Sequence, residues 1–220
     1  VKELVEKIKN KFPNLPIKEP EYQYISTIDI DNAFYFQEKG FVRSVAGFLG
    51  SLFTFDFQGI KQRFSVVFGD EKDPYDTYQI QLQIQKKHNL EVIYFILLAD
   101  YGLNDKNISF TNRRFQLLIK RLADFAKIGI HPSYGSNSNY NKLPKEIKRL
   151  EGITKKEVTK SRQHFLKLTL PATYNHLSDL GITDDYTMGY ASAVGFRASI
   201  CTPFTFYNLD LESALPLKVH

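Results

Sequence analysis

Asp29 and Asp31 form the first of four segments whose side chains could carry out acid–base or metal chemistry. Residues two apart in extended chain point to the same face, so the two carboxylates can act together. One of them can bind a cation while the other accepts a proton, because paired like charges need a cation or a proton between them. An Asx turn or a helix cap at the end of a strand would use the same residues without chemistry.

Two further segments place imidazole groups near the ends of predicted strands. His131, followed by Pro132 and Ser133, suits a neutral imidazole ligand at the end of a buried strand. Arg162 and His164 again lie two residues apart, so Arg162 could orient a carboxylate and His164 could bind a metal or move protons. A hydrogen-bonded structural histidine and a surface extension of the neighbouring basic run are the plainer interpretations.

The fourth segment, 184–190, is polar and aromatic and follows a short predicted strand at Ile182. It suits contacts to a sugar ring or the orientation of another residue. His88 and His176 are interpreted as structural or solvated, and the terminal His220 is uninformative. Cys201 has no base beside it in the sequence and is not interpreted as a nucleophile. The sequence has no glycine-rich phosphate loop, no Gly-x-Ser-x-Gly elbow and no His-Glu-x-x-His motif.

These side chains need elements that bring them together, and the hydrophobic pattern predicts strands that alternate with helices. Strands are expected over 22–31, 91–99, 128–130 and 161–166, and from 196 onward. Helices are expected over 1–12, 40–52, 76–89, 110–127, 143–151, 154–160 and 171–180, with a short element near 60–68 and a loop over 133–141. This alternation favours an α/β domain with a mostly parallel sheet, where chemistry gathers at the carboxyl ends of the strands.

Composition narrows the class of protein. The chain has 220 residues, 43% hydrophobic, and a formal charge of +5. Nine Lys or Arg residues and three acids lie between 142 and 167, a net +6, so the remainder sums to −1. A broad nucleic-acid surface is therefore not indicated, and we expect no nucleic-acid partner. One cysteine excludes an internal disulfide framework, and no apolar run has the roughly eighteen residues of a membrane span.

The two ends of the sequence suggest a division of the chain. Residues 1–20 are expected to form an N-terminal helix and linker, as the remnant of an upstream region, and residues 21–220 a catalytic domain. The missing initial Met and the end at His220 indicate a fragment of a longer protein. No signal peptide is visible at the N-terminus, which together with the single cysteine favours a cytoplasmic location.

The order of the four segments resembles the polysaccharide deacetylases of the NodB-homology type. The match covers roughly 22–210 and is nearest to a divergent bacterial branch encoded beside surface-polysaccharide genes. The resemblance implies a distorted (β/α) barrel of about seven strands and one divalent metal ion, usually zinc. It also implies removal of N- or O-acetyl groups from a carbohydrate polymer.

The first two motifs of that family imply which residues are the metal ligands and the general base. Thr27 to Asp31 is similar to Thr-Phe-Asp-Asp with one residue inserted, which implies Asp29 as general base and Asp31 as metal ligand. The insertion leaves a swap of these two roles open. The His-(Ser/Thr)-x-x-His motif matches at His131 but has Gly135 in place of its second histidine, and His164 is the candidate replacement.

The remaining family motifs assign supporting residues. Arg162 matches the arginine that orients the catalytic aspartate, and Asp185 falls near the motif that supports the acid–base residues. The Leu-x-x-His motif of the general acid has its letters only in Leu217–His220, at the very end, so no acid is assigned. Ser133, Tyr134 and Tyr186 are the residues expected to contact the substrate.

The leading hypothesis is therefore a metal-dependent carbohydrate deacetylase. A non-catalytic carbohydrate-binding relative is the alternative, motivated by the two family histidines without a match. A metal-dependent glycosyltransferase, with Asp29-Ile30-Asp31 as its Asp-x-Asp motif, ranks lowest. The basic segment between His131 and His164 could guide an anionic glycan toward the site or form a solvated helix face.

Overall fold

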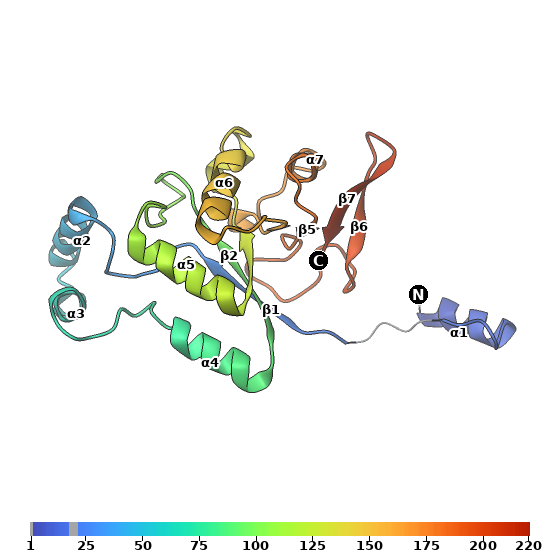
Figure 1. Cartoon of the computed structure of the whole chain (residues 1–220), viewed down its shortest axis with the longest axis horizontal. Coiled ribbons are helices and arrows are strands. Elements are labelled where there is room, and N and C mark those ends of the chain that lie inside the picture. The colour runs from blue at the N-terminus through green and yellow to red at the C-terminus, as the bar shows by residue number, and fades with distance from the viewer. Residues whose placement is uncertain (1, 18–21) are drawn as a thin grey trace.

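The centre of the molecule is a twisted, mostly parallel sheet (Figure 1). The computed structural model describes residues 2–17 and 22–220, and within these ranges seven strands pair in the order β1-β2-β3-β4-β5-β7-β6. Pairing is parallel from β1 to β7, and β6 runs antiparallel to β7. The strands are β1 (Ile25–Ile30), β2 (Glu91–Ile96), β3 (Lys127–Ile130), β4 (Lys160–Ser161), β5 (Asp184–Asp185), β6 (Phe204–Asn208) and β7 (Ser213–Val219).

Helices cover the sheet and extend beyond it. They are α1 (Lys2–Lys11), α2 (Phe41–Phe53), α3 (Phe57–Phe68), α4 (Tyr78–His88), α5 (Arg113–Phe125), α6 (Leu143–Thr154) and α7 (Ala172–Asp179), with short 3₁₀ turns η1 (Tyr134–Asn137) and η2 (His164–Leu166). The helix α5 shows why these segments form: Phe115, Ile119 and Leu122 recur at helical spacing and are buried. Asn112 caps its first turn by accepting the backbone N–H of Phe115.

The core lies on both sides of β2, whose residues from Val92 to Ile96 are all buried. That burial explains the continuous apolar run of the strand, because a parallel strand covered on two faces has no polar side. Buried residues of α5, α6 and α7 pack against the same cluster. The predicted α/β class with a mostly parallel sheet is confirmed.

The sheet curls into a distorted barrel that has a seam. Arg162, just after β4, donates a hydrogen bond to Thr27 of β1 at 2.7 Å, so the first and fourth strands face each other across the interior. Among the described residues the edge strands β1 and β6 do not pair. A cavity of about 650 Å³ is lined by residues of both strands and of the strand ends between them. The expected fold, a distorted barrel of about seven strands, is confirmed.

Two predicted elements differ from the structure. Residues 154–160 do not form a helix, because α6 ends at Thr154 and Lys155 adopts a left-handed conformation with φ of 57°. Beyond it the chain is extended and buries Val158. The strand expected over 161–166 is confined to the two residues of β4, and the chain then turns into η2, where Phe165 has φ of 59°.

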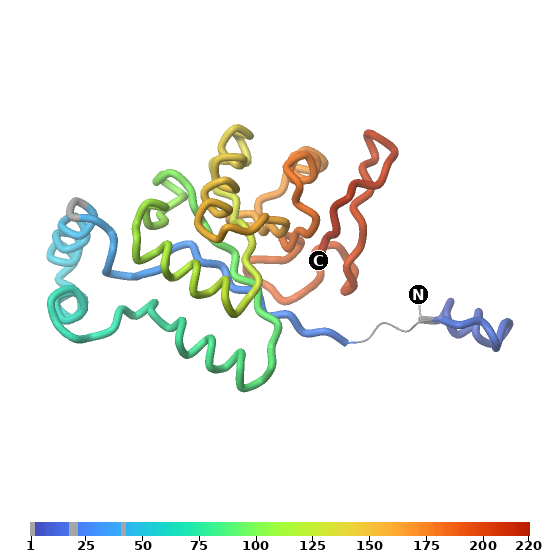
Figure 2. The backbone as a smooth tube through the Cα atoms, viewed as in Figure 1, coloured from blue at the N-terminus to red at the C-terminus, as the bar shows by residue number. Residues whose placement is uncertain are grey.

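The segment between β1 and α4 leaves the sheet to form the α2–α3 hairpin. Figure 2 shows this hairpin at the far left of the view, away from the β6–β7 hairpin and from α1 on the right. Across residues 2–17 and 22–220, no helix combines the length and apolar character that crossing a membrane requires.

Candidate active site

The register of the parallel sheet brings the ends of six strands to one level. A paired row of residues runs through Ile30, Ile96, Ile130, Ser161, Asp185 and Val219. The residues that follow this row on β1, β3, β4, β5 and β7 are Asp31, His131, Arg162, Tyr186 and His220. Four residues predicted from the sequence, and one regarded there as uninformative, therefore meet at the carboxyl edge of the sheet.

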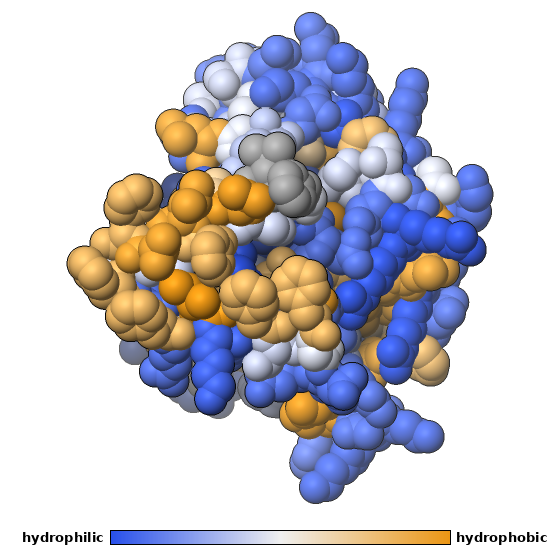
Figure 3. Space-filling view, turned by 90° about the vertical axis from the view of Figure 1, so that its left-hand side faces the viewer, coloured by the Kyte–Doolittle hydropathy of each residue, from blue (hydrophilic) through white to orange (hydrophobic). Residues whose placement is uncertain are grey.

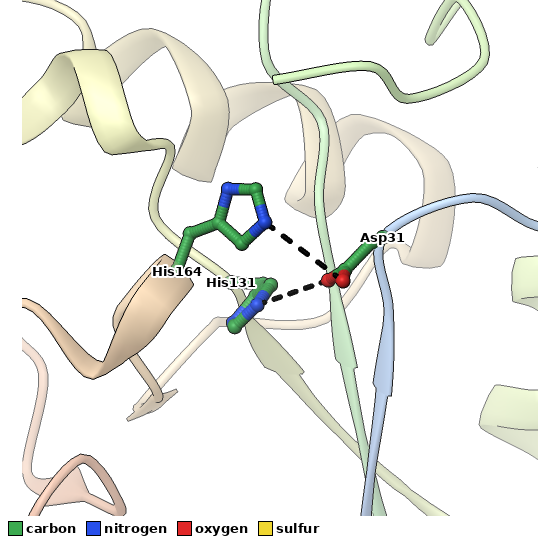
Figure 4. A group of neighbouring side chains, drawn as sticks. All are labelled: Asp31, His131 and His164. Carbon is green, nitrogen blue, oxygen red and sulfur yellow. Dashed lines mark ion pairs between the residues drawn. The ribbon is translucent and has the colours of Figure 1, made fainter. Parts of the chain in front are cut away.

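Asp31, His131 and His164 form a tight cluster at this edge (Figure 4). Oδ1 of Asp31 lies 3.1 Å from Nε2 of His131, and Oδ2 lies 3.8 Å from Nε2 of His164. Atoms able to bind a metal on these three residues all lie within 4.8 Å of one another. Both imidazoles are buried, whereas 56% of the Asp31 side chain is exposed, so the cluster opens to solvent on the aspartate side.

The buried contacts of His131 fix the position of its proton. Nδ1 lies 2.5 Å from the carbonyl oxygen of Arg162, which can only accept, so Nδ1 carries the hydrogen. In the neutral ring, Nε2 then presents its lone pair to the Asp31 carboxylate. Two acceptors that face each other at this distance require a cation or a proton between them.

His164 is fixed in the same way by Asp105, a residue for which the sequence predicts no role. Oδ1 of Asp105 lies 2.9 Å from Nδ1 of His164, and the same carboxylate accepts the backbone N–H groups of Tyr134 and Gly135 at 2.8 and 3.2 Å. Burial would raise the pKa of Asp105, but these hydrogen bonds outweigh it and the pKa lies below its ordinary value. An ionised Asp105 turns Nε2 of His164 toward Asp31.

The same electrostatics act on Asp31. Burial raises the pKa of this carboxyl, while the hydrogen bond and charge of His131 and the charge of His164, when these imidazoles are protonated, lower it more, so the net shift is downward. The chemistry of the three groups, two imidazole nitrogens and a carboxylate oxygen, is the donor set typical of catalytic zinc and similar divalent ions. The residues present therefore fit such an ion.

Gly135 occupies the place of the second family histidine and lies beside Lys142 and Asp105. A Cβ at this position would lie 2.7 Å from Nζ of Lys142 and 3.6 Å from Oδ2 of Asp105. A side chain at this position would require the flexible Lys142 side chain to move, and its Cβ would contact the Asp105 carboxylate. His164, held by that carboxylate, supplies the second imidazole of the cluster instead.

Asp29 lies beside the cluster and is held by Arg162. Nη1 of Arg162 is 3.2 Å from Oδ1 of Asp29. The guanidinium is itself fixed, because Nε donates to the carbonyl of Tyr186 at 3.1 Å and Nη2 donates to Thr27. Asp29 and Asp31 line one cavity of about 350 Å³, so a small group could contact both carboxylates.

His220 is part of this edge, which corrects its interpretation as an uninformative terminus. Its Nε2 lies 2.8 Å from Oδ1 of Asp184, and its ring stacks on Tyr186 with centroids 4.2 Å apart. Burial, together with the charges of Lys160 and Lys218, lowers the pKa of His220 more than Asp184 raises it. His220 and Arg162 line the same 650 Å³ cavity. The letters of Leu217–His220, together with a strand ending there, were the available sequence signal.

Asp185, expected to support the acid–base residues, lies behind the strand ends. It is fully buried and accepts hydrogen bonds from the hydroxyls of Ser161 and Thr187 at 2.6 and 2.9 Å, and burial raises its pKa. Among the described contacts it has none with Asp29. Asp185 therefore joins β4 to β5 and supports the strands that carry Arg162, while its neighbour Asp184 contacts the histidine.

The three residues expected to contact substrate fall in different environments. Ser133 is 1% exposed, and its hydroxyl donates to Glu146 at 2.6 Å, so it has no free surface for a ligand. Tyr134 is half-buried and packs edge-to-face on Phe165. Tyr186 lines the large cavity beside His220.

The fold matches that of a known class of enzyme, the polysaccharide deacetylases. The structure superposes on a putative polysaccharide deacetylase from Mycobacterium smegmatis with a TM-score of 0.54 and 14% identity, covering 93% of this chain. The chain spans 60% of the length of that protein. The resemblance inferred from the sequence is thus confirmed for the fold.

Two other solved structures align less closely. A mutant of a CE4 family pseudoenzyme with restored enzymatic activity has a TM-score of 0.42 and 13% identity, covering 76% of this chain and 47% of that one. IcaB from Ammonifex degensii has a TM-score of 0.41 and 10% identity, covering 77% and 86%. No family model and no curated protein matches the sequence.

Proposed function

We propose that this domain is a metal-dependent carbohydrate deacetylase that hydrolyses an N- or O-acetyl group on a polysaccharide or its precursor. The observation that carries the proposal is the orientation of two buried imidazoles, each with Nδ1 bound to an acceptor and Nε2 directed at Asp31. The shared fold with a putative deacetylase supports it. Asp31, His131 and His164 are the proposed ligands of one divalent ion, and zinc is the metal we propose.

When bound, such an ion polarises the acetyl carbonyl and lowers the pKa of a bound water. Asp29 is the proposed general base, because it lies next to the cluster and lines the same cavity as Asp31. Arg162 is its positioning residue, since the bonds to Thr27 and Tyr186 fix the guanidinium that Asp29 contacts.

His220 is the proposed proton donor to the departing amine or alcohol. Asp184 accepts the Nε2 hydrogen and orients the ring, which leaves Nδ1 for proton transfer. Because burial lowers the pKa of His220, its protonated form is a stronger acid than an exposed imidazolium. The stack on Tyr186 keeps the ring plane fixed at the wall of the large cavity.

The alternative functions are less well supported. The missing family histidine and the missing acid motivated a non-catalytic relative. In the proposed site, His164 and His220 take these two places, which favours an active enzyme. A glycosyltransferase needs both carboxylates of its Asp-x-Asp motif free for a metal–diphosphate, whereas Asp29 is paired with Arg162.

An anionic glycan is the proposed substrate type. The ammonium of Lys167 lies 4.1 Å from the ring centre of Tyr134, and Lys142 lies beside Gly135, so two cations flank the loop next to the cluster. Tyr134 and Tyr186 remain proposed substrate contacts. The division into residues 1–20 and 21–220 and the cytoplasmic location stay predictions.

Metal content and acetate release test the proposal together. We expect the purified chain to bind one equivalent of zinc or cobalt and to release acetate from acetylated glycans. Asp31→Ala and His131→Ala should lose both properties, while His176→Ala, a histidine outside the cluster, should keep them. Unchanged metal content in both cluster variants would show that the metal site is wrongly assigned. Glycan binding without acetate release from the metal-loaded protein would favour the non-catalytic alternative.

A further inference from the structure

The α2–α3 hairpin, residues 41–68, presents an apolar surface that the proposed active site does not use. Figure 3 shows apolar side chains gathered at the end of the molecule where Figure 1 places α2 and α3. The exposed apolar residues, called here the hairpin surface, are Val45, Leu49, Leu52, Phe53, Phe55, Phe57, Phe64, Val67 and Phe68. Contiguous apolar surface of this kind marks an interaction site.

The two arginines of the hairpin face the domain rather than solvent. Arg43 donates to the carbonyls of Asn107 and Lys106 at 3.1 and 2.9 Å. The Arg63 guanidinium lies 4.9 Å from the ring centre of Phe36. These two arginines thus attach the hairpin to the domain, while the nine apolar side chains of the hairpin surface are exposed.

The tip of the hairpin carries three exposed phenylalanines, Phe53, Phe55 and Phe57. Phe55 is 77% exposed and has φ of 55°, a left-handed conformation that favours glycine or asparagine. A bulky ring there fills no core and fits the backbone poorly. An exposed apolar ring at this position is free to insert into an apolar phase outside the protein.

The charges near the hairpin surface indicate which partner it binds, a lipid bilayer or a second copy of the chain. On α3 the exposed Lys61 stands at helical spacing between Phe57 and Phe64. The acid of the hairpin, Asp56, caps α3 by accepting the backbone N–H of Gly59 at 2.9 Å. Face-to-face pairing of two hairpins would bury Lys61 among phenylalanines, with no acid of the hairpin other than the capping Asp56 to pair it, which is costly.

A phospholipid surface offers a suitable environment both to the apolar rings and to Lys61. The apolar rings enter the acyl region while the long side chain of Lys61 extends to the phosphate groups, as lysines do on interfacial helices. We propose that the α2–α3 hairpin docks this domain on a phospholipid bilayer, with Phe53, Phe55 and Phe57 inserted and Lys61 at the headgroups. The proposal does not rest on deacetylase activity.

Tryptophan fluorescence gives a direct test, because the chain has no tryptophan. Phe55→Trp should shift its emission to shorter wavelength with vesicles of phosphatidylcholine and phosphatidylglycerol in equal parts, and brominated lipids should quench it. In co-sedimentation, Phe53→Ser with Phe57→Ser should lower the vesicle partition coefficient more than about tenfold. Lys61→Glu should weaken binding to the mixed vesicles more than to pure phosphatidylcholine.

Leu103→Ser with Leu209→Ser is the matched control, since both leucines are exposed outside the hairpin. This variant should bind vesicles like the wild-type chain. Two results would overturn the proposal. One is wild-type protein that sediments with neither vesicle. The other is a stable dimer in light scattering that the Phe53→Ser, Phe57→Ser variant loses while vesicle binding is absent, which would make a second copy the occupant.

Discussion

Oδ1 of Asp105 lies 2.9 Å from Nδ1 of His164, accepts its hydrogen, and so directs Nε2 of the ring at Asp31. The two residues lie 59 positions apart, on the loop after β2 and on η2. Carboxylates in this role fix the tautomer of a ligand and raise its basicity. Asp105 is therefore a positioning residue for the proposed metal site.

Replacing Asp105 should weaken metal binding without removing any ligand. For Asp105→Ala we expect metal affinity to fall about 10- to 100-fold, as for other partners of metal-bound histidines. Titration calorimetry with zinc measures the loss. Nitrogen NMR of the metal-free protein should show His164 changing tautomer while His131 keeps its own. Asp100→Ala, on the same loop but paired with Arg149, is the control. Equal affinity in the wild type and Asp105→Ala would exclude this role.

Mutagenesis should distinguish the roles of the neighbouring carboxylates Asp29 and Asp31. Asp29→Asn removes the proposed base and should lower kcat about 10²- to 10⁴-fold with metal content unchanged. Asp31→Asn should instead lose the metal. Steady-state rates and metal analysis of both variants check the assignment. If Asp29→Asn lost the metal and Asp31→Asn kept it, the two roles would have to be exchanged.

His220 should matter most where the leaving group is poor. A departing amine needs a proton, whereas p-nitrophenolate leaves without one. For His220→Gln we expect acetate release from an N-acetylated glycan to fall about 10²- to 10⁴-fold and hydrolysis of p-nitrophenyl acetate to change far less. Parallel assays of the two substrates measure the ratio. An equal loss on both substrates would contradict a role as general acid.

Asp73 should stabilise the segment that follows Asp31. Its buried carboxylate accepts the backbone N–H groups of Tyr35, Phe36 and Gln37 at 2.7 to 3.0 Å. Burial raises its pKa, but the N–H groups lower it more, to below 3.8. Because the native pKa is depressed, the stabilisation is present above pH 3.8 and is lost as the pH falls through the native pKa.

Asp73→Ala should therefore lower the free energy of unfolding by about 1–3 kcal/mol at neutral pH, since it leaves buried N–H groups unpaired. The difference from the wild type should shrink as the pH falls below 3.8. Urea titrations at neutral and acid pH measure it. Asp70→Ala, an exposed acid nearby, should have little effect at either pH. A deficit that grows in acid would reverse the sign of this argument.

Periodicity predicted the elements that hold the site but not all of the side chains in it. The apolar run of β2 and the helical spacing of α5 needed no tertiary information. The helix expected over 154–160 does not form, because α6 ends at Thr154 and Lys155 adopts a left-handed conformation that its basic, helix-like surroundings do not reveal. His164 was expected in a strand, yet it reaches Asp31 from a 3₁₀ turn whose sharp bend lies at Phe165.

Asp105 and the pair of Asp184 with His220 were missed for a different reason. Each acts through a contact between residues far apart in the chain, 59 positions in one case and 36 in the other. Local spacing carries no information on such pairs. The shared register of the strand ends, which brings Asp31, His131 and His220 to one edge, becomes visible when the sheet pairing is known.

The proposed ligands come from the ends of β1, β3 and β4, and β2 lies between the first two. No single hairpin or helix pair contains the site, so the unfolded chain has no preformed place for the ion. An ion that binds the native state alone adds RT ln(1 + [L]/Kd) to its stability, about 2.7 kcal/mol at a free concentration of 100 Kd. Chelation should then lower the melting temperature of the whole barrel in one cooperative transition. The bound metal would thus stabilise four strands together, β1 to β4.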